Sequence, residues 1–187
     1  PSRSSYFGIC DLAGLPKDRY YLYRSRWNKQ QHTIHLLPHW SWGKSKKDKD
    51  NRLGEITPVY CYTDYPEAEL FVNGKSQGRI SKRLDERVKP DGSRTVKETE
   101  PLIDRYRLRW NNVVYEPGEI RVVVYDADGV RKGESVCRTA GQPHHLVIEQ
   151  QTLDEYHGPS VLRADGEDMA FFVVSAVDKE GNLCPEA

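Results

Sequence analysis

The chain has 187 residues, and its 28 Lys and Arg residues balance its 28 Asp and Glu residues. This length suits one ordinary domain, or a small domain with pieces of its neighbours. A net charge of zero provides no electrostatic attraction to nucleic acid or to an anionic membrane. No apolar run approaches the roughly 20 residues of a membrane helix. We therefore expect neither nucleic acid nor a membrane as a partner.

Residues 1–27 differ in pattern from the rest of the chain. Pro16 can begin a helix, because a proline in the first turn sacrifices no hydrogen bond. In the helix that follows, Tyr20, Tyr23 and Trp27 share one face, which we interpret as a packing surface. A helix this short is not stable alone, so we expect it to dock on the following domain or on one outside this chain.

From residue 31 onward the pattern is that of β-strands. The central stretch, residues 56–80, reads as two strands and a tight hairpin. Asn73-Gly74 is the dipeptide that best tolerates the positive φ angles of a two-residue hairpin turn. Side chains alternate across a strand, so Leu70 and Val72 are expected on one face.

Further strands follow on both sides of a polar excursion at residues 81–101, in which one edge strand is expected near Thr95-Val96. Residues 105–110 alternate, with aromatic and aliphatic side chains on one face and three arginines on the other. The arginine row could bind phosphate, but the zero net charge favours a solvated or interdomain face. The run 126–129 is interpreted as an Asp-Gly hairpin rather than a calcium loop, because the glutamate and helices of an EF-hand are missing.

The fold class predicted from these patterns is all-β. We expect an immunoglobulin-like β-sandwich at residues 28–140, after a loop and helix at 1–27. Residues 141–187 contain about three strand patterns, which are too few for a domain of their own, because a sandwich needs about seven. They are therefore interpreted as the start of a second, partial β-sandwich.

The four cysteines, Cys10, Cys61, Cys137 and Cys184, form no C-x-x-C pair and have no histidine at zinc-ligand spacing. We expect four thiols, and leave open a Cys61–Cys137 bridge between the sheets. No metal site and no cofactor is predicted.

Several motifs resemble family 2 glycoside hydrolases of the bacterial β-galactosidase type. Residues 4–23 are similar to the stretch that closes the catalytic barrel, and residues 35–42 to the opening of the immunoglobulin-like domain after it. Residues 69–78 resemble that domain's hairpin. Segments 138–141, 164–168 and 178–182 resemble the join to the next sandwich.

The resemblance implies a retaining glycoside hydrolase as the parent protein, with two catalytic glutamates on the barrel. Such chemistry needs two carboxyl groups about 5–5.5 Å apart. No Glu or Asp here matches the family's catalytic motifs, so no catalytic residue is assigned and activity of the chain itself stays undecided. The expected role is a non-catalytic accessory region that packs on the barrel domain of the same polypeptide and shapes its active site.

Sugar contact is the alternative role, with His39, Trp40 and Trp42 as the candidate substrate-binding residues. Aromatic faces stack on pyranose rings, and an imidazole can hydrogen-bond hydroxyl groups. The competing interpretation, which we favour, is that Trp40 and Trp42 are core or interdomain residues. Residues 6–11 are a second candidate, because the resemblance places them near the mouth of the barrel.

Two function classes therefore compete with the accessory role. An autonomous carbohydrate-binding module would bind oligosaccharide through exposed tryptophans, whereas a cell-surface adhesion domain leaves residues 1–27 unexplained. A role of the accessory region in oligomer contacts is left open. No signal peptide is predicted at the start of the chain. By resemblance, the parent is expected in the periplasm or outside the cell and is expected to hydrolyse terminal β-galactosides or related β-glycosides. The sequence does not decide between β-galactosides, β-glucuronides and a decorated plant glycan.

Overall fold

The computed structural model of the chain describes residues 7–12, 14–43, 51–82, 102–151 and 163–185. The expected edge strand near Thr95-Val96 lies outside the described residues. The chain divides into two compact units, residues 1–139 and 140–187, and each is described by itself.

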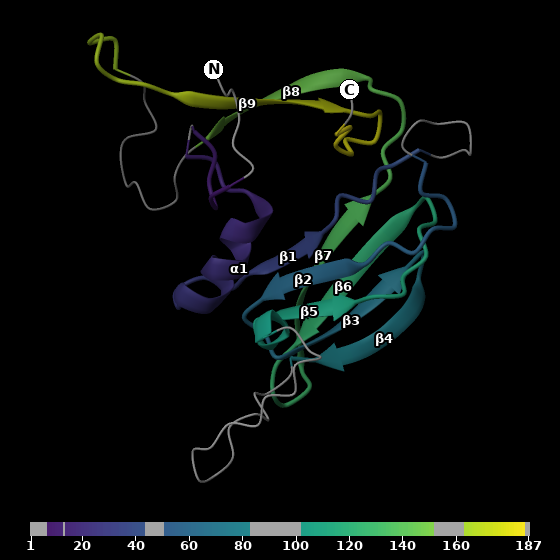
Figure 1. Cartoon of the computed structure of the whole chain (residues 1–187). Helices are drawn as coiled ribbons and strands as arrows, with labels where there is room; N and C mark the ends of the chain where they lie inside the picture. The colour runs from purple at the N-terminus through teal and green to yellow at the C-terminus, as the bar shows by residue number, and fades with distance from the viewer. Residues whose placement is uncertain (1–6, 13, 44–50, 83–101, 152–162, 186–187) are drawn as a thin grey trace. The chain divides into compact units, whose positions relative to one another are not determined.

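Among its described residues, the first unit contains one α-helix, a short 3₁₀ helix and seven strands (Figure 1). In chain order these are α1 (Asp18–Trp27), β1 (Ile34–Leu37), β2 (Val59–Thr63), β3 (Glu67–Val72), β4 (Lys75–Ser81), η1 (Leu102–Arg105), β5 (Arg107–Trp110), β6 (Glu119–Tyr125) and β7 (Arg131–Arg138).

These strands form two antiparallel sheets, one with the order β1-β2-β5 and the other with the order β4-β3-β6-β7. The sheets enclose one core, because alternate side chains of β2 and β3 point inward. The all-β, immunoglobulin-like sandwich predicted from the sequence is confirmed. The buried apolar core consists of Leu36, Trp40, Val59, Cys61, Ala68, Leu70, Val72, Leu108, Trp110, Val113, Tyr115, Ile120, Val122 and Val124.

The hairpin predicted at Asn73-Gly74 joins β3 to β4, with φ angles of 47° and 79° at the two turn residues. Leu70 and Val72 are both buried, as expected from strand alternation. β2 and β3, however, belong to different sheets. The turn between them, residues 64–66, therefore carries the chain from one layer of the sandwich to the other.

The second unit contains β8 (His145–Gln151) and β9 (Phe171–Val177), which pair antiparallel. Asp178, which follows β9, is a buried polar residue of this unit and is 1% exposed. Whether residues 141–187 begin a second sandwich, and whether residues 1–27 derive from a barrel, stay predictions.

Candidate functional site

Helix α1 docks on the outer face of β1 and β2, but not through the aromatic stripe that the sequence suggested. Tyr23 and Trp27 contact each other, yet they are 38% and 70% exposed. The docking face contains Asp18, Tyr21 and Ser25 instead, at helical positions i, i+3 and i+7. Tyr23 and Trp27 therefore do not pack on the sandwich, and docking of the stripe on a domain outside this chain stays a prediction.

The contact between α1 and β1 is centred on His35. Its Nε2 lies 2.8 Å from Asp18 Oδ1, and its ring stacks on Tyr21 at 4.0 Å between centroids. The hydrogen bond to His35 lowers the pKa of Asp18, against a smaller opposing effect of burial. The hydrogen bond and the ring stacking of His35 thus connect the helix to the sheet.

Of the predicted sugar-contact residues, Trp40 lies entirely inside the core, with none of its surface exposed. Its Nε1 donates to the Glu116 carbonyl at 3.0 Å, and its own carbonyl accepts from Thr139 Oγ1 at 2.7 Å. The ring meets Tyr115 edge to face at 5.0 Å. Trp40 has no ring face available for a ligand.

Trp42 is half-buried beside this core, and its backbone is tied to Tyr115. The Tyr115 hydroxyl donates to the Trp42 carbonyl at 3.1 Å and accepts from the Trp42 N–H at 3.3 Å. The Arg52 guanidinium lies 4.9 Å from the Trp42 ring centroid, and the His39 ring lies 4.7 Å from it. The structure therefore brings His39 and Trp42 together at the edge of the aromatic core.

His39 is exposed, and its protonation state suits hydrogen bonding to a hydroxyl group. Partial burial, followed by the Arg52 charge, lowers its pKa, with Asp18 acting in the opposite sense. Its Nδ1 accepts a hydrogen bond from the Ser41 N–H at 3.0 Å. In the neutral ring the proton must then sit on Nε2, which becomes a donor.

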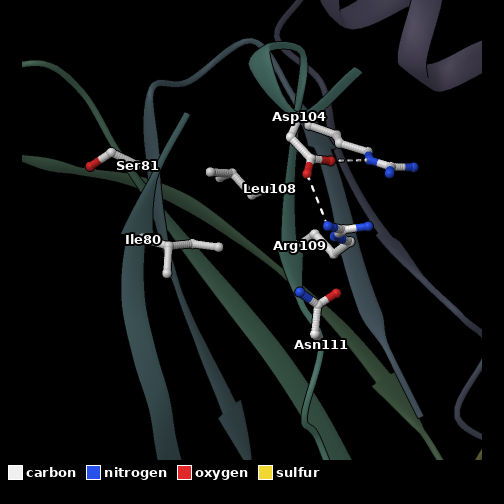
Figure 2. Close-up of a pocket in the computed structure, with 7 residues that line it drawn as sticks. Ile80, Ser81, Asp104, Leu108, Arg109 and Asn111 are labelled. Atoms are coloured by element: carbon white, nitrogen blue, oxygen red, sulfur yellow. Dashed lines mark hydrogen bonds and ion pairs between the residues drawn. The ribbon is translucent and has the colours of Figure 1, made fainter. Parts of the chain in front are cut away.

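A second feature, which the sequence did not indicate as a site, is a pocket of about 300 Å³ between strands β4 and β5 (Figure 2). Both are edge strands, one from each sheet, and Trp110 Nε1 connects them by donating to the Gly78 carbonyl at 3.0 Å. Ile80 and Ser81 form the β4 side of the pocket. This pocket could not be predicted from the sequence, because the residues of its two walls are far apart along the chain.

The β5 side of the pocket is polar. Asp104, from η1, lies 2.8 Å from Arg107 Nε through one carboxylate oxygen and 3.1 Å from Arg109 Nη2 through the other (Figure 2). Asn111 completes this wall and is exposed. The arginine row predicted from the sequence is thus partly neutralised by a single carboxylate.

The described residues contain no group of three His, Cys, Asp or Glu side chains that could hold a metal ion. Among the helices of the described segments, none has the length and apolar character to cross a bilayer. All four cysteines are free thiols, so the Cys61–Cys137 bridge does not form.

The class that the fold defines is an immunoglobulin-like β-sandwich domain. Residues 54–132 match a protein family described as "Domain of unknown function (DUF4982)". The whole chain is 40% identical to a β-galactosidase of Bacteroides ovatus over 188 aligned residues, and it spans 18% of that enzyme. It is 32% identical over 95% of its length to a putative β-glucuronidase of Formosa agariphila, of which it spans 14%.

Comparison with solved structures also finds glycoside hydrolases. A β-glycosidase from Bacteroides vulgatus matches 97% of this chain with 19% of its own length, at a TM-score of 0.69 and 26% identity. A β-glucuronidase from glycoside hydrolase family 2 matches 96% of this chain with 15% of its own length, at a TM-score of 0.68 and 26% identity. The chain is thus similar over nearly its full length to a region of larger glycoside hydrolases, one of them described as a family 2 enzyme, and it spans less than a fifth of each of these four relatives.

Proposed function

We propose that this chain is a non-catalytic accessory region of a family 2 glycoside hydrolase, which packs on the catalytic barrel of the same polypeptide and shapes its active site. The observation that carries the proposal is the extent of the match to the Bacteroides ovatus β-galactosidase. The alignment runs through all of this chain but only 18% of that enzyme. A hydrolase of terminal β-galactosides or related β-glycosides is the parent activity that fits.

The carboxyl groups support a non-catalytic role. A glycosidase general acid needs a raised pKa, which an apolar environment provides. Among the described residues, every carboxyl with a shifted pKa is shifted downward by hydrogen bonds or cations. A carboxylate stabilised in its charged form is a poor proton donor at neutral pH.

In this proposal, helix α1 connects the sandwich to the catalytic barrel. Its attachment through Asp18 and His35 fixes the segment before residue 34 on the sandwich. If residues 1–27 close a barrel, as their resemblance implies, this contact sets the orientation of the sandwich against the barrel. The loop before α1 would then line the rim of the active site.

We also propose that residues 141–187 belong to a further sandwich. The register of β8 and β9 puts Leu146, Ile148, Phe172 and Val174 on one face. Each of these side chains is more than half exposed in the described part of the chain. A two-stranded sheet is marginal by itself, and additional strands would bury this face.

Two assays test the accessory role. The isolated chain should hydrolyse neither aryl β-galactosides nor aryl β-glucuronides, and genuine turnover would refute the non-catalytic assignment. In the second assay, this chain replaces the matching region of the Bacteroides ovatus β-galactosidase. The chimera should remain active, whereas deletion of the region should lower kcat/KM. Unchanged kcat/KM and stability after deletion would refute the accessory role.

A carbohydrate-binding module is the second candidate, favoured by the exposed His39 ring beside Trp42. Because Trp40 is fully buried, this proposal depends on the other two residues. Isothermal titration with galactose, lactose and plant oligosaccharides tests it. Saturable binding that is lost in Trp42→Ala but kept in Trp27→Ala would support a module, and no heat with any sugar would reject it.

A further inference from the structure

The pocket between β4 and β5 carries more positive than negative charge. Asp104 faces both Arg107 and Arg109, so two guanidinium groups share one carboxylate. One positive charge is therefore uncompensated by the described residues that line the pocket. Arg107 is held in place, because its guanidinium also lies 4.9 Å from the Tyr60 ring centroid. Arg109 therefore has N–H donors that do not face Asp104 and can bind a ligand.

The donors and acceptors around this charge suit a ligand with several oxygen atoms. A guanidinium has five N–H donors in a planar fork that matches a carboxylate, and Arg109 directs one nitrogen, Nη2, to Asp104. The Asn111 amide supplies two donors and an acceptor. The Ser81 hydroxyl points away from Arg109 and donates to Glu67 at 2.9 Å (Figure 2), so the polar contacts to a ligand come from Arg109 and Asn111.

The pocket also has an apolar part, and its volume limits the ligand. Leu108 is almost fully buried beneath it, and Ile80 is half-buried on the opposite wall (Figure 2). A volume of about 300 Å³ is at the lower end of the range for small-molecule sites, which is roughly 300–1,000 Å³. A small ligand with C–H groups on one side and oxygen atoms on the other fits this combination.

We propose that this pocket binds the carboxylate of a single uronic acid residue. Arg109 pairs with the carboxylate, Asn111 hydrogen-bonds the ring hydroxyls, and the C–H face of the sugar lies against Ile80. Asp104 is a positioning residue that orients Arg109. This site is separate from the His39–Trp42 edge, and the inference does not depend on the proposed accessory role.

The test is a titration of the full chain, by isothermal calorimetry or NMR, with methyl β-D-glucuronide and with galacturonate. Methyl β-D-glucoside, which lacks the carboxylate, and acetate, which lacks the sugar, are the matched comparison ligands. We expect saturable binding of the uronates, weakened by added salt, with at least about tenfold weaker binding of both comparison ligands. Equal binding of the glucoside or of acetate, or no binding of a uronate, would overturn the proposal.

Two variants locate the binding. Arg109→Gln should weaken uronate binding about tenfold or more, because it removes a charge-assisted hydrogen bond. Asn111→Ala alters an exposed side chain, so its folding should be intact and its affinity still reduced. Arg131→Gln, in β7, removes the same charge from an exposed arginine and should bind normally, as should Trp42→Ala. Full affinity in Arg109→Gln and Asn111→Ala, or a loss in Arg131→Gln, would refute this location.

Discussion

The side chain of Asn73, in the β3–β4 turn, hydrogen-bonds to the backbone on both sides of Gly118. Asn73 Oδ1 accepts the Glu119 N–H at 2.8 Å, and Nδ2 donates to the Pro117 carbonyl at 3.2 Å. Gly118 has a φ angle of 136°, and a methyl group there would overlap Asn73 Oδ1. One side chain thus connects a local hairpin to the start of β6.

We predict that Gly118→Ala lowers the free energy of unfolding by about 1–3 kcal/mol, because both its φ angle and the overlap oppose a side chain. Asn73→Ala should cost about 1–2 kcal/mol through the two lost hydrogen bonds. Urea unfolding monitored by tryptophan fluorescence measures both. Lys75→Ala, on the exposed side of the same hairpin, is the control and should change stability by less than about 0.5 kcal/mol. A Gly118→Ala variant as stable as the unsubstituted chain would contradict the predicted overlap with Asn73.

The features predictable from the sequence are those encoded locally. The Asn73-Gly74 turn and the burial of Leu70 follow from a dipeptide and a period of two residues. The partners of Asn73 are not predictable in this way, because Pro117 and Glu119 are more than 40 residues away. The pocket between β4 and β5 could not be predicted for the same reason, because its walls come from the edge strands of two different sheets.

The aromatic residues show where pattern and structure diverge. Helical spacing correctly grouped Tyr23 with Trp27, but spacing does not say which face of a helix docks. The docked face is the one that contacts His35, which lies on β1 and binds Asp18 and Tyr21. Similarly, the sequence identified Trp40 and Trp42 as a pair but could not assign one to the core and the other to its edge.

Trp40 should be essential for the stability of the sandwich. Trp40→Ala removes a fully buried indole and its hydrogen bond to Glu116, and we expect it to lower the free energy of unfolding by about 3–5 kcal/mol. Trp27→Ala is the matched control, because Trp27 is 70% exposed, and its expected effect is below about 0.5 kcal/mol. Chemical denaturation followed by circular dichroism compares them. Similar losses in both variants would show that Trp40 is not a core residue.

The Asp18–His35 contact should stabilise helix α1 by a modest amount. The Asp18 side chain is 66% exposed, so we expect a coupling energy of only about 0.5–1 kcal/mol in a double-mutant cycle with Asp18→Asn and His35→Gln. The folded-state pKa of Asp18 lies below its ordinary value of 3.8. Its contribution is therefore present above that value and lost as the pH falls below it. Hydrogen exchange of the α1 amides should report the same loss, and strictly additive mutant effects would contradict the coupling.

The thiol of Cys61 should resist modification in the folded protein. Cys61 has no exposed surface, and burial raises its pKa to about 12, opposed in part by Lys82. The thiolate, which is the reactive form, is therefore scarce at neutral pH. Labelling with iodoacetamide, followed by peptide mass spectrometry, should show Cys61 modified only after unfolding in urea. Rapid labelling of Cys61 under native conditions, at the rate of the urea-unfolded control, would contradict its burial.

Asp178 should make the second unit sensitive to acid. Its carboxylate accepts hydrogen bonds from the Gly141 N–H at 2.6 Å, from the Asn182 side chain at 3.0 Å, and from the Asn182 and Glu180 N–H groups. The Gly141 bond is the largest contribution to lowering the Asp178 pKa from 3.8 to about 2, and burial opposes the change. Because the folded-state pKa is the lower one, this stabilisation is complete above about pH 4 and is lost as the pH falls through about 2.

Amide hydrogen exchange of Gly141 and Asn182 measures this effect. Protection corrected for the intrinsic pH dependence should fall between about pH 4 and pH 2. In Asp178→Asn, which cannot carry the charge, protection should be lower at neutral pH and should lack this acid transition. Asp128→Asn changes an exposed turn residue of the first unit and should leave the transition intact. An acid transition that persists unchanged in Asp178→Asn would assign it to another carboxyl group and refute the role of Asp178.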